Sequence, residues 1–462
     1  MSPQEAAASV RAAMPASGLF SGQEWRVSPA PFQLTDSLAK ELLDLGRVLL
    51  QFNRAVNLLY RQSVASKQPS WVAGWLDQGK PAALVEAQRN ATIKNELPRV
   101  IRPDILLTED GLRITELDSV PGGIGLTAWL NQTYSAIQNG ASEVIGGHDG
   151  MATGFAGIFG DASNVNIVVS EEAQTYRPEM DWLAAKLGDR FRVRDGSFTD
   201  FKDGEAVYRF FELFDLPNIP NSKQIIDEAL AGRIRLTAPP KPIFEEKMLF
   251  GLLWNRHLAS FWRQELGEKF FERLRQLAPY TWIVDPSPLP PHAAIPELGL
   301  TDWRQLKTMS QRERELILKI SGFSDKAWGA RGVYLGSDLS SADWSAAVDE
   351  AIRSFGTSPY VLQRYHKPSL HPAQWFDFEK KQIVDMPGRV RLCPYYFVNG
   401  EGDTARANLS GVLATICPAD KKIIHGMSTA ILAPCSGLLV PPVKDALTAV
   451  RASLSADAKG KK

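Results

Sequence analysis

Four charged residues in the segment RPDILLTEDGLRITELD, residues 102–118, have the types and spacing of a metal or phosphate site. The segment predicts a β-hairpin with the three-residue loop 109–111, in which Gly111 takes the left-handed conformation that such loops favour. Because side chains alternate along a strand, this register puts all four charged side chains on one face. A two-residue loop would break that arrangement. The facing pairs are Asp104 with Glu116 and Arg102 with Asp118.

The predicted face carries three carboxylates and one guanidinium group. Carboxylates this close repel one another unless a cation lies among them, and oxygen ligands suit Mg²⁺, which completes its shell with phosphates and water. Arg102 would neutralise charge on a transferring phosphoryl group, as a catalytic side chain. The alternative is a solvent-facing hairpin with ordinary surface charges. The metal ligands of the first interpretation are Asp104, Glu116 and Asp118.

A second segment, LILKISGFSDKAWGARGVYLG at residues 316–336, joins an apolar strand carrying Lys319 to a glycine-rich loop. Glycine lets backbone N–H groups approach phosphate oxygens closely, and a lysine adds a point charge. The spacing is neither GxxxxGK[ST] nor GxGxxG, so it is not one of the common phosphate-binding fingerprints. The segment fits a phosphate-binding loop, and an ordinary surface hairpin is an equal alternative. The loop glycines are Gly322, Gly329 and Gly332.

A third segment, SPYVLQRY at residues 358–365, follows the second beyond a helix predicted over 341–354. An apolar strand that ends in Gln363-x-Tyr365 is by itself an ordinary core strand. After a lysine-bearing strand and a glycine-rich loop, it also fits a hinge that binds adenine.

The order of strand lysine, glycine-rich loop, helix and VLQRY strand resembles the nucleotide-binding half of the ATP-grasp fold. In that family the lysine contacts phosphates, the loop covers them, and the hinge holds adenine through backbone groups. In most members the metal carboxylates follow these elements, whereas here the acidic hairpin precedes them. That order is similar to circularly permuted ATP-grasp proteins of the glutathionylspermidine synthetase type, whose hairpin reads R-x-D and then E-x-N. Arg102, Asp104 and Glu116 match this pattern, while Asp118 stands where asparagine is usual.

A second lysine extends the resemblance. The segment EEKMLFGLLW, residues 245–254, resembles the family's N-K-x-x-x-x-L-L-W segment, which makes Lys247 the other phosphate-side lysine. Lys269 is a competing candidate for that role. The alternative for Lys247 is a lysine whose stem lies along a helix surface.

Four polar residues lie on or near the last predicted strands. Arg389 and Arg391 lie on an apolar strand where an unpaired arginine is costly, so we expect them to face phosphate, substrate or an acidic partner. A structural ion pair is an equal alternative. Arg406 and Asn408 are candidates to reach the triphosphate or metal, with a plain loop as the alternative.

Composition argues against several classes of partner. The chain has 52 basic and 52 acidic residues, so it has no net charge to attract nucleic acid or an anionic membrane. Its three cysteines lack CxxC spacing and nearby histidines, which disfavours disulfides and structural zinc. No apolar run has the length of a signal peptide core or a membrane span, so we expect a cytoplasmic protein. The sequence does not indicate an oligomeric state.

The elements that must position these residues fall into five parts. Helical periodicity over 35–63 predicts a long amphipathic helix, and short apolar runs at 165–170 and 207–214 predict strands of a small α/β unit. The ELFD segment, 212–215, is expected to be core with surface acids. The parts are a flexible arm (1–30), a helical segment plus metal-binding hairpin (31–155), a pre-ATP-grasp-like α/β unit (156–240), an ATP-grasp nucleotide-binding region (241–445) and a tail (446–462).

With the resemblance, these parts predict an α+β fold, a circularly permuted ATP-grasp with a helical N-terminal part. The resemblance implies an ATP- and Mg²⁺-dependent ligase that forms an acyl phosphate on a small-molecule carboxylate and transfers the acyl group to an amine. The sequence identifies neither substrate. Two alternatives stay open, a nucleotide-binding protein that has lost ligation and a phosphotransferase that stops at a phosphorylated product.

Overall fold

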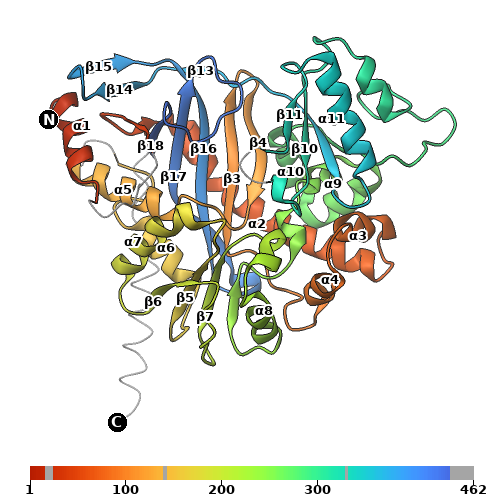
Figure 1. Cartoon of the computed structure of the whole chain (residues 1–462), viewed down its shortest axis with the longest axis horizontal. Helices are drawn as coiled ribbons and strands as arrows, with labels where there is room; N and C mark the ends of the chain where they lie inside the picture. Colours follow the sequence, from red (N-terminus) through yellow and green to blue (C-terminus); the bar gives the residue numbers. More distant parts are fainter. Residues whose placement is uncertain (16–23, 139–142, 328–330, 438–462) are drawn as a thin grey trace.

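The computed structural model describes residues 1–15, 24–138, 143–327 and 331–437. An eight-stranded central sheet forms the middle of the molecule (Figure 1). Its main path is β1 (Arg26–Val27), β18 (Ile431–Ser436), β17 (Arg406–Pro418), β16 (Gly388–Asn399), β3 (Val100–Thr108) and β4 (Gly111–Asp118). Beside this path, β13 (Leu370–His371) pairs with β16 and β2 (Phe32–Gln33) pairs with β18. A separate hairpin consists of β14 (Gln374–Asp377) and β15 (Gln382–Asp385).

The β3–β4 hairpin pairs Asp104 with Glu116 and Arg102 with Asp118, as the sequence predicts. The predicted three-residue loop is wrong, because Thr108 pairs with Gly111 and only two residues lie between the strands. Gly111 does have the expected positive φ, 96°. A register shift beside Asp104 leaves Thr115 as one extra residue in β4. This bulge restores the side-chain parity that a two-residue loop alone would have lost.

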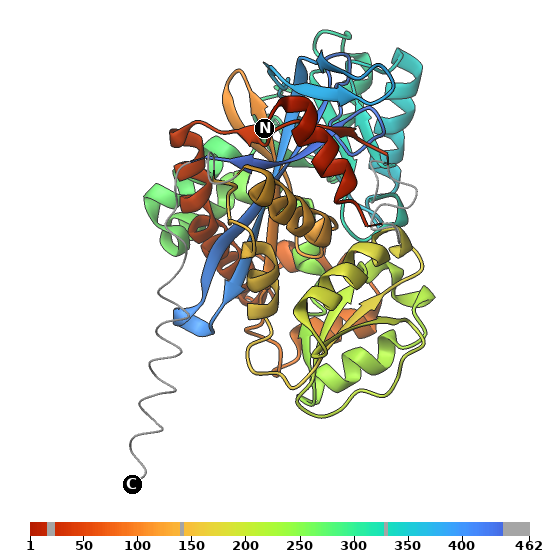
Figure 2. The same cartoon turned by 90° about the vertical axis from the view of Figure 1, so that its left-hand side faces the viewer.

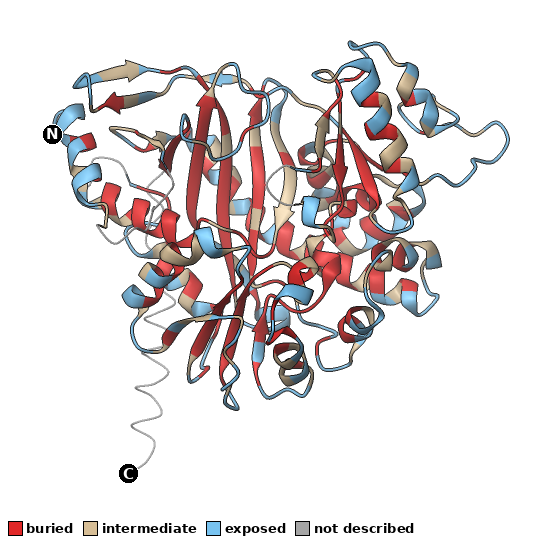
Figure 3. Cartoon of the chain, in the orientation of Figure 1, coloured by how far each residue is buried: buried red, intermediate tan, exposed pale blue. Residues whose placement is uncertain are grey.

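The two faces of the central sheet are covered by different helices. On one face lies α2 (Asp36–Val64), which begins at the predicted position because the Thr35 side chain accepts a hydrogen bond from the Leu38 N–H. Gly46 allows close packing there, since a Cβ at this position would lie 2.7 Å from the carbonyl oxygen of Ala407. The opposite face packs against α5 (Ile124–Gln138) and α6 (Gly150–Gly157). Figure 3 shows the buried strands between these layers.

A parallel four-stranded sheet forms the predicted α/β unit, at the bottom of Figure 1. The strand predicted over 207–214 ends earlier, at Phe210, because the chain turns into a 3₁₀ helix after it and the Leu213 N–H donates to the Glu245 carboxylate. The strand order is β6 (Phe191–Asp195), β5 (Val165–Val169), β7 (Ala206–Phe210) and β8 (Arg235–Thr237), with α7 (Arg177–Leu187) and α8 (Ser222–Leu230) in the same unit.

A second four-stranded sheet, here called the β10 sheet, contains the predicted lysine strand and VLQRY strand as neighbours. The predicted helix over 341–354 is α11 (Ser341–Arg353). The sheet order is β11 (Val333–Leu335), β10 (Leu316–Ile320), β12 (Tyr360–Arg364) and β9 (Thr281–Ile283). The remaining α-helices are α3 (Ser70–Asp77), α4 (Ala82–Arg89), α9 (Met248–Trp254) and α10 (Ala259–Leu277). Short 3₁₀ helices span Gln174–Tyr176, Leu213–Asn218, Pro242–Glu245, Arg256–Leu258, Trp303–Thr308, Asp325–Ala327 and Gly402–Thr404.

Part of the segment 1–30, which the sequence predicts to be a flexible arm, is helical instead. Residues 3–12 form α1 (Pro3–Ala12), which starts with a capping box between Ser2 and Glu5 and buries Ala7 and Val10. Figure 2 shows α1 lying against the rest of the molecule. The predicted tail, 446–462, lies outside the described residues. Among those described, no helix is both long and apolar enough to cross a membrane.

Candidate functional site

One cavity of about 920 Å³ takes its walls from the central sheet, the β10 sheet and the α/β unit. It collects residues from five separate segments of the sequence, between positions 102 and 391. The predicted site residues that line it are Arg102, Asp104, Glu116, Asp118, Lys247, Lys319, Gly322, Gln363, Tyr365 and Arg391.

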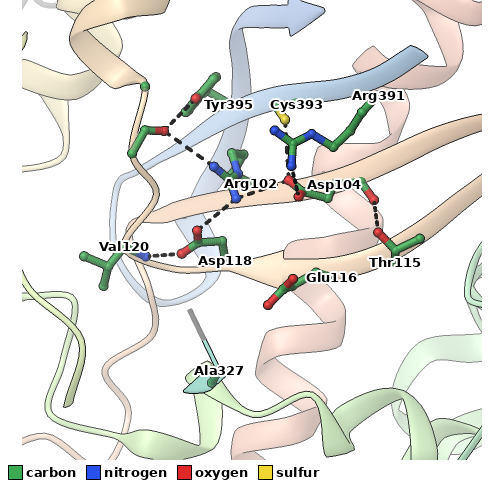
Figure 4. A network of polar contacts seen from close by, with 12 residues as sticks. Arg102, Asp104, Thr115, Glu116, Asp118, Val120, Ala327, Arg391, Cys393 and Tyr395 are labelled. Atoms are coloured by element: carbon green, nitrogen blue, oxygen red, sulfur yellow. Dashed lines mark hydrogen bonds and ion pairs between the residues drawn. The ribbon is translucent and has the colours of Figure 1, made fainter. Parts of the chain in front are cut away.

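Asp104 is held by two arginines on the sheet that forms the cavity floor. Its Oδ1 lies 3.1 Å from Arg102 and its Oδ2 lies 2.9 Å from Arg391, which comes from the neighbouring strand β16 (Figure 4). Cys393 Sγ also donates to Oδ1 at 3.4 Å. Burial alone would raise the pKa of Asp104, but the charges of Arg102 and Arg391 outweigh it and lower that pKa. Asp104 is therefore an ionised anchor for both guanidinium groups, and Arg391 has the acidic partner expected of a buried arginine.

Arg102 also contacts the second carboxylate, Asp118, at 3.0 Å, so it bridges β3 and β4. The other oxygen of Asp118 accepts the Val120 N–H at 2.9 Å. The pKa of Asp118 is nevertheless raised, chiefly by burial and in part by the negative charges of Glu116 and Asp104. A bound cation would relieve that penalty.

Lys247 and Lys319 both contact residues of β4 across the cavity. Lys247 Nζ lies 2.9 Å from Glu116 Oε1 and 3.2 Å from the carbonyl oxygen of Ala327. Lys319 Nζ lies 3.1 Å from the Thr115 carbonyl oxygen and 3.0 Å from Gln363 Oε1. Burial lowers the pKa of Lys319 to about 8, although the nearby Glu116 charge opposes this shift. The two lysines and the acidic strand thus form one cluster.

The described part of the glycine-rich loop borders this cluster. Gly322 lines the cavity, and a Cβ there would lie 1.5 Å from the Glu245 carbonyl oxygen, so only glycine fits. Gly332 serves the hairpin instead, because a Cβ there would lie 2.4 Å from the Ile320 side chain. Gly329 lies outside the described residues. Beyond the gap, Arg331 reaches Glu172 of the α/β unit at 2.7 Å.

The predicted hinge contributes in two ways. The Gln363 side chain is buried and connects Lys319 to Thr281, with a hydrogen bond of 3.1 Å to the latter. Tyr365 borders the cavity just beyond β12, and its own N–H donates to Glu315 at 3.0 Å. Gln363 therefore orients a lysine, which the sequence pattern does not reveal.

Besides Gly332, three predicted residues and one competing candidate do not line the cavity. Arg389 points to the carbonyl oxygens of Ala419 and Pro368. Lys269 is exposed on α10. Arg406 and Asn408 line a separate hollow beside α2, because they lie at the start of the long strand β17. These two therefore lie apart from the predicted phosphate and metal residues, and their role there stays a prediction.

The arrangement of the predicted carboxylates decides whether the site can bind Mg²⁺. Across the described ranges, no three His, Cys, Asp or Glu side chains are gathered as a ready metal-binding group. The predicted set of three is not preassembled, since Asp104 is buried between arginines. Glu116 and Asp118 remain open to the cavity, with 38% and 23% of their side chains exposed. Two carboxylates plus phosphate oxygens are a sufficient donor set for Mg²⁺, so the residues present fit this ion.

Two acids missed by the sequence interpretation also face the cavity. Glu212 and Glu245 line it, and burial, followed by the neighbouring Glu245 charge, raises the pKa of Glu212 well above its ordinary value. Glu245 is in turn paired with Arg209. The ELFD segment is thus more than core with surface acids. The alternation of apolar and acidic residues in ELFD does not predict this role, because the neighbouring Glu245 lies in a later segment.

Comparisons with known proteins bear on the fold alone. No protein-family model matches the chain, and no curated protein matches it. A solved structure of a glutathione synthetase-like effector from Globodera pallida, in the apo form, is similar with a TM-score of 0.51 at 11% identity, over 95% of this chain and 98% of that chain. A candidate gamma-glutamylcysteine synthetase from Methylobacillus flagellatus KT gives a TM-score of 0.38 at 11% identity, over 83% and 88%. The first likeness indicates a shared mixed α/β fold along nearly the whole length of both chains.

Proposed function

We propose that this protein is an ATP-dependent carboxylate–amine ligase of the circularly permuted ATP-grasp type. The observation that carries the proposal is the meeting of Lys247 and Lys319 with the acidic strand β4 around Glu116. Lysines are suited to phosphate oxygens, and carboxylates beside them are suited to the metal that accompanies ATP. A fold shared with a glutathione synthetase-like structure agrees with a ligase.

In the proposed site, Lys247 and Lys319 bind the phosphates and the loop at Gly322 covers them. Glu116 and Asp118 would hold Mg²⁺, and Asp104 fixes the direction of Arg102. When bound, Mg²⁺ supplies positive charge that offsets the charge of the triphosphate. Each lysine then exchanges its contact on β4 for a phosphate oxygen.

The proposed reaction has two steps. A substrate carboxylate oxygen attacks the γ-phosphorus, the bond to the β-phosphate oxygen breaks, and ADP leaves. Arg102 stabilises the charge on the phosphoryl group during this transfer. An amine nitrogen then attacks the acyl carbon, loses a proton, and releases inorganic phosphate as the amide forms. Water must be kept away from the acyl phosphate, which suits a cavity that lies between three parts of the fold and is bordered by the glycine-rich loop.

Polar atoms without partners support a ligand on the sheet floor. Within the described chain, the Thr415 hydroxyl and the Nε atoms of Arg102 and Arg391 are buried and make no hydrogen bond. All three residues line the cavity. Buried polar groups usually have partners, so these atoms are suited to a polar substrate group.

The test is a screen of carboxylate and amine pools for ADP release, with Glu116→Ala and Lys319→Ala as controls. The proposal predicts release that needs both pools and is lost in both variants. ATP binding without turnover in any pool would instead favour a nucleotide-binding protein. A phosphorylated product with no amide would favour the phosphotransferase.

A further inference from the structure

Glu246 is a buried residue directly before Lys247, and both of its carboxylate oxygens have polar partners. Oε1 forms an ion pair with Lys80, and the two side chains are 1% and 0% exposed. Oε2 accepts hydrogen bonds from the Ser321 hydroxyl and, at 3.4 Å, from the Gly322 N–H. One carboxylate therefore joins the segment before α4, the start of α9 and the root of the glycine-rich loop.

The loop is held at a second point by the next residue. Lys247 Nζ donates to the Ala327 carbonyl oxygen at 3.2 Å, five residues beyond Gly322. Gly322 itself packs against the Glu245 carbonyl oxygen at a distance that excludes a side chain. The short segment 245–247 thus sets where the described part of the loop begins and where it passes Lys247.

Stability alone gives a weak reason for this arrangement. Burying an ion pair costs much of what the attraction returns, and apolar residues of similar volume often stabilise a fold as well. Apolar residues cannot reproduce the directional bonds to Ser321 and Gly322. Because those bonds are made to the loop, they favour a role in positioning the loop over a role in stabilising the core.

We propose that Glu246 is a positioning residue that fixes Lys247 and the root of the glycine-rich loop around the terminal phosphates of ATP. This inference rests on the proposed function, because it requires nucleotide to bind in this cavity. It adds a residue that acts through Lys247 and the loop without touching the substrate.

The test compares Ser321→Ala with Ser324→Ala. The Ser321 hydroxyl donates to Glu246, whereas the Ser324 hydroxyl, in the same loop, donates to the neighbouring Asp325 at 3.3 Å and accepts the Lys326 N–H at 3.2 Å, so its contacts stay within the loop. Calorimetry would give the dissociation constants of a non-hydrolysable MgATP analogue and of AMP. We expect Ser321→Ala to weaken the ATP analogue about tenfold, the scale of one hydrogen bond to a charged group, while AMP binding stays unchanged. Ser324→Ala should leave both constants at the values of the parent.

Glu246→Gln gives a second arm, with the same direction and a larger change. Because this variant leaves Lys80 buried without its counter-charge, the double variant Lys80→Gln/Glu246→Gln provides an uncharged pair. A ratio of ATP to AMP affinity that is the same in Ser321→Ala as in the parent would overturn the inference, as would an equal change in Ser324→Ala. A parent protein that binds no ATP would overturn both the inference and the proposed function.

Discussion

Lys319 donates a hydrogen bond of 3.1 Å to the carbonyl oxygen of Thr115, a residue 204 positions earlier in the chain. Thr115 is the extra residue of the β4 bulge, and Glu116 follows it directly. The two residues belong to different sheets. Their contact brings the lysine strand and the acidic strand together in one site.

Lys247 and Lys269 offer a matched pair of substitutions. We expect Lys247→Met to weaken MgATP binding by about 2 kcal/mol, the scale of a charge-assisted hydrogen bond to phosphate. Lys269→Met should have no effect, because Lys269 is exposed on α10 and does not line the cavity. Calorimetric titration checks both. Equal losses in the two variants would contradict the assignment of Lys247.

The lowered pKa of Lys319 predicts that the protein takes up protons when nucleotide binds. Its pKa of about 8 lies below the ordinary lysine value, so about half of the side chains are neutral at pH 8 in the free protein. An arriving phosphate favours the ammonium form, so binding at pH 8 should take up roughly half a proton. Titration in two buffers with different ionisation enthalpies measures this number. At pH 6.5 the lysine is already charged and its uptake should vanish. Binding heats at pH 8 that do not depend on the buffer would refute the assignment.

Glu116 should govern the response to magnesium. Replacing it by Gln removes one of the two accessible carboxylates, so we expect about tenfold more Mg²⁺ to be needed for half-maximal ATP binding. Glu109→Gln, an exposed change in the hairpin turn, is the control and should behave like the parent. The measurement is a Mg²⁺ titration at fixed ATP. An unchanged midpoint in Glu116→Gln would exclude Glu116 as a ligand.

The raised pKa of Glu179 predicts that the free energy of unfolding depends on pH. Its carboxylate is buried at the N-terminus of α5, accepts the N–H groups of Gly123 and Leu126, and has a pKa raised by burial to about 7. Between about pH 4.5 and 7 the folded state keeps a proton that the unfolded state loses, so the free energy of unfolding falls as pH rises through this window. The loss is at most about 3 kcal/mol. We expect Glu179→Gln to show a smaller decline than the parent between pH 5 and 8 in chemical denaturation. Parallel declines would show that Glu179 does not hold this proton.

Local patterns predict much of the fold. The strong periodicity over 35–63 corresponds to α2, and the apolar runs correspond to β5, β10 and β12. The facing pairs of the acidic hairpin are confirmed, but by a bulge and not by the predicted loop. A bulge depends on the neighbouring strands, so the sequence of the hairpin alone does not indicate it.

Site residues that the sequence does not predict depend on contacts between distant segments. The buried Glu246 has its counter-charge in Lys80, 166 positions away, and a local sequence pattern does not reveal that partner. Arg406 and Asn408 lie apart from the cavity because β17 is long and they are at its start. At about 3.3 Å per residue, Asn408 lies roughly 23 Å along β17 from Thr415, which lines the cavity.

The most direct measurement is a crystal structure of the protein with Mg²⁺ and a non-hydrolysable ATP analogue. The account predicts terminal phosphates in contact with Lys247 and Lys319, and the metal bound to Glu116 and Asp118. An analogue whose phosphates lie elsewhere, with Lys247 still paired to Glu116, would contradict it.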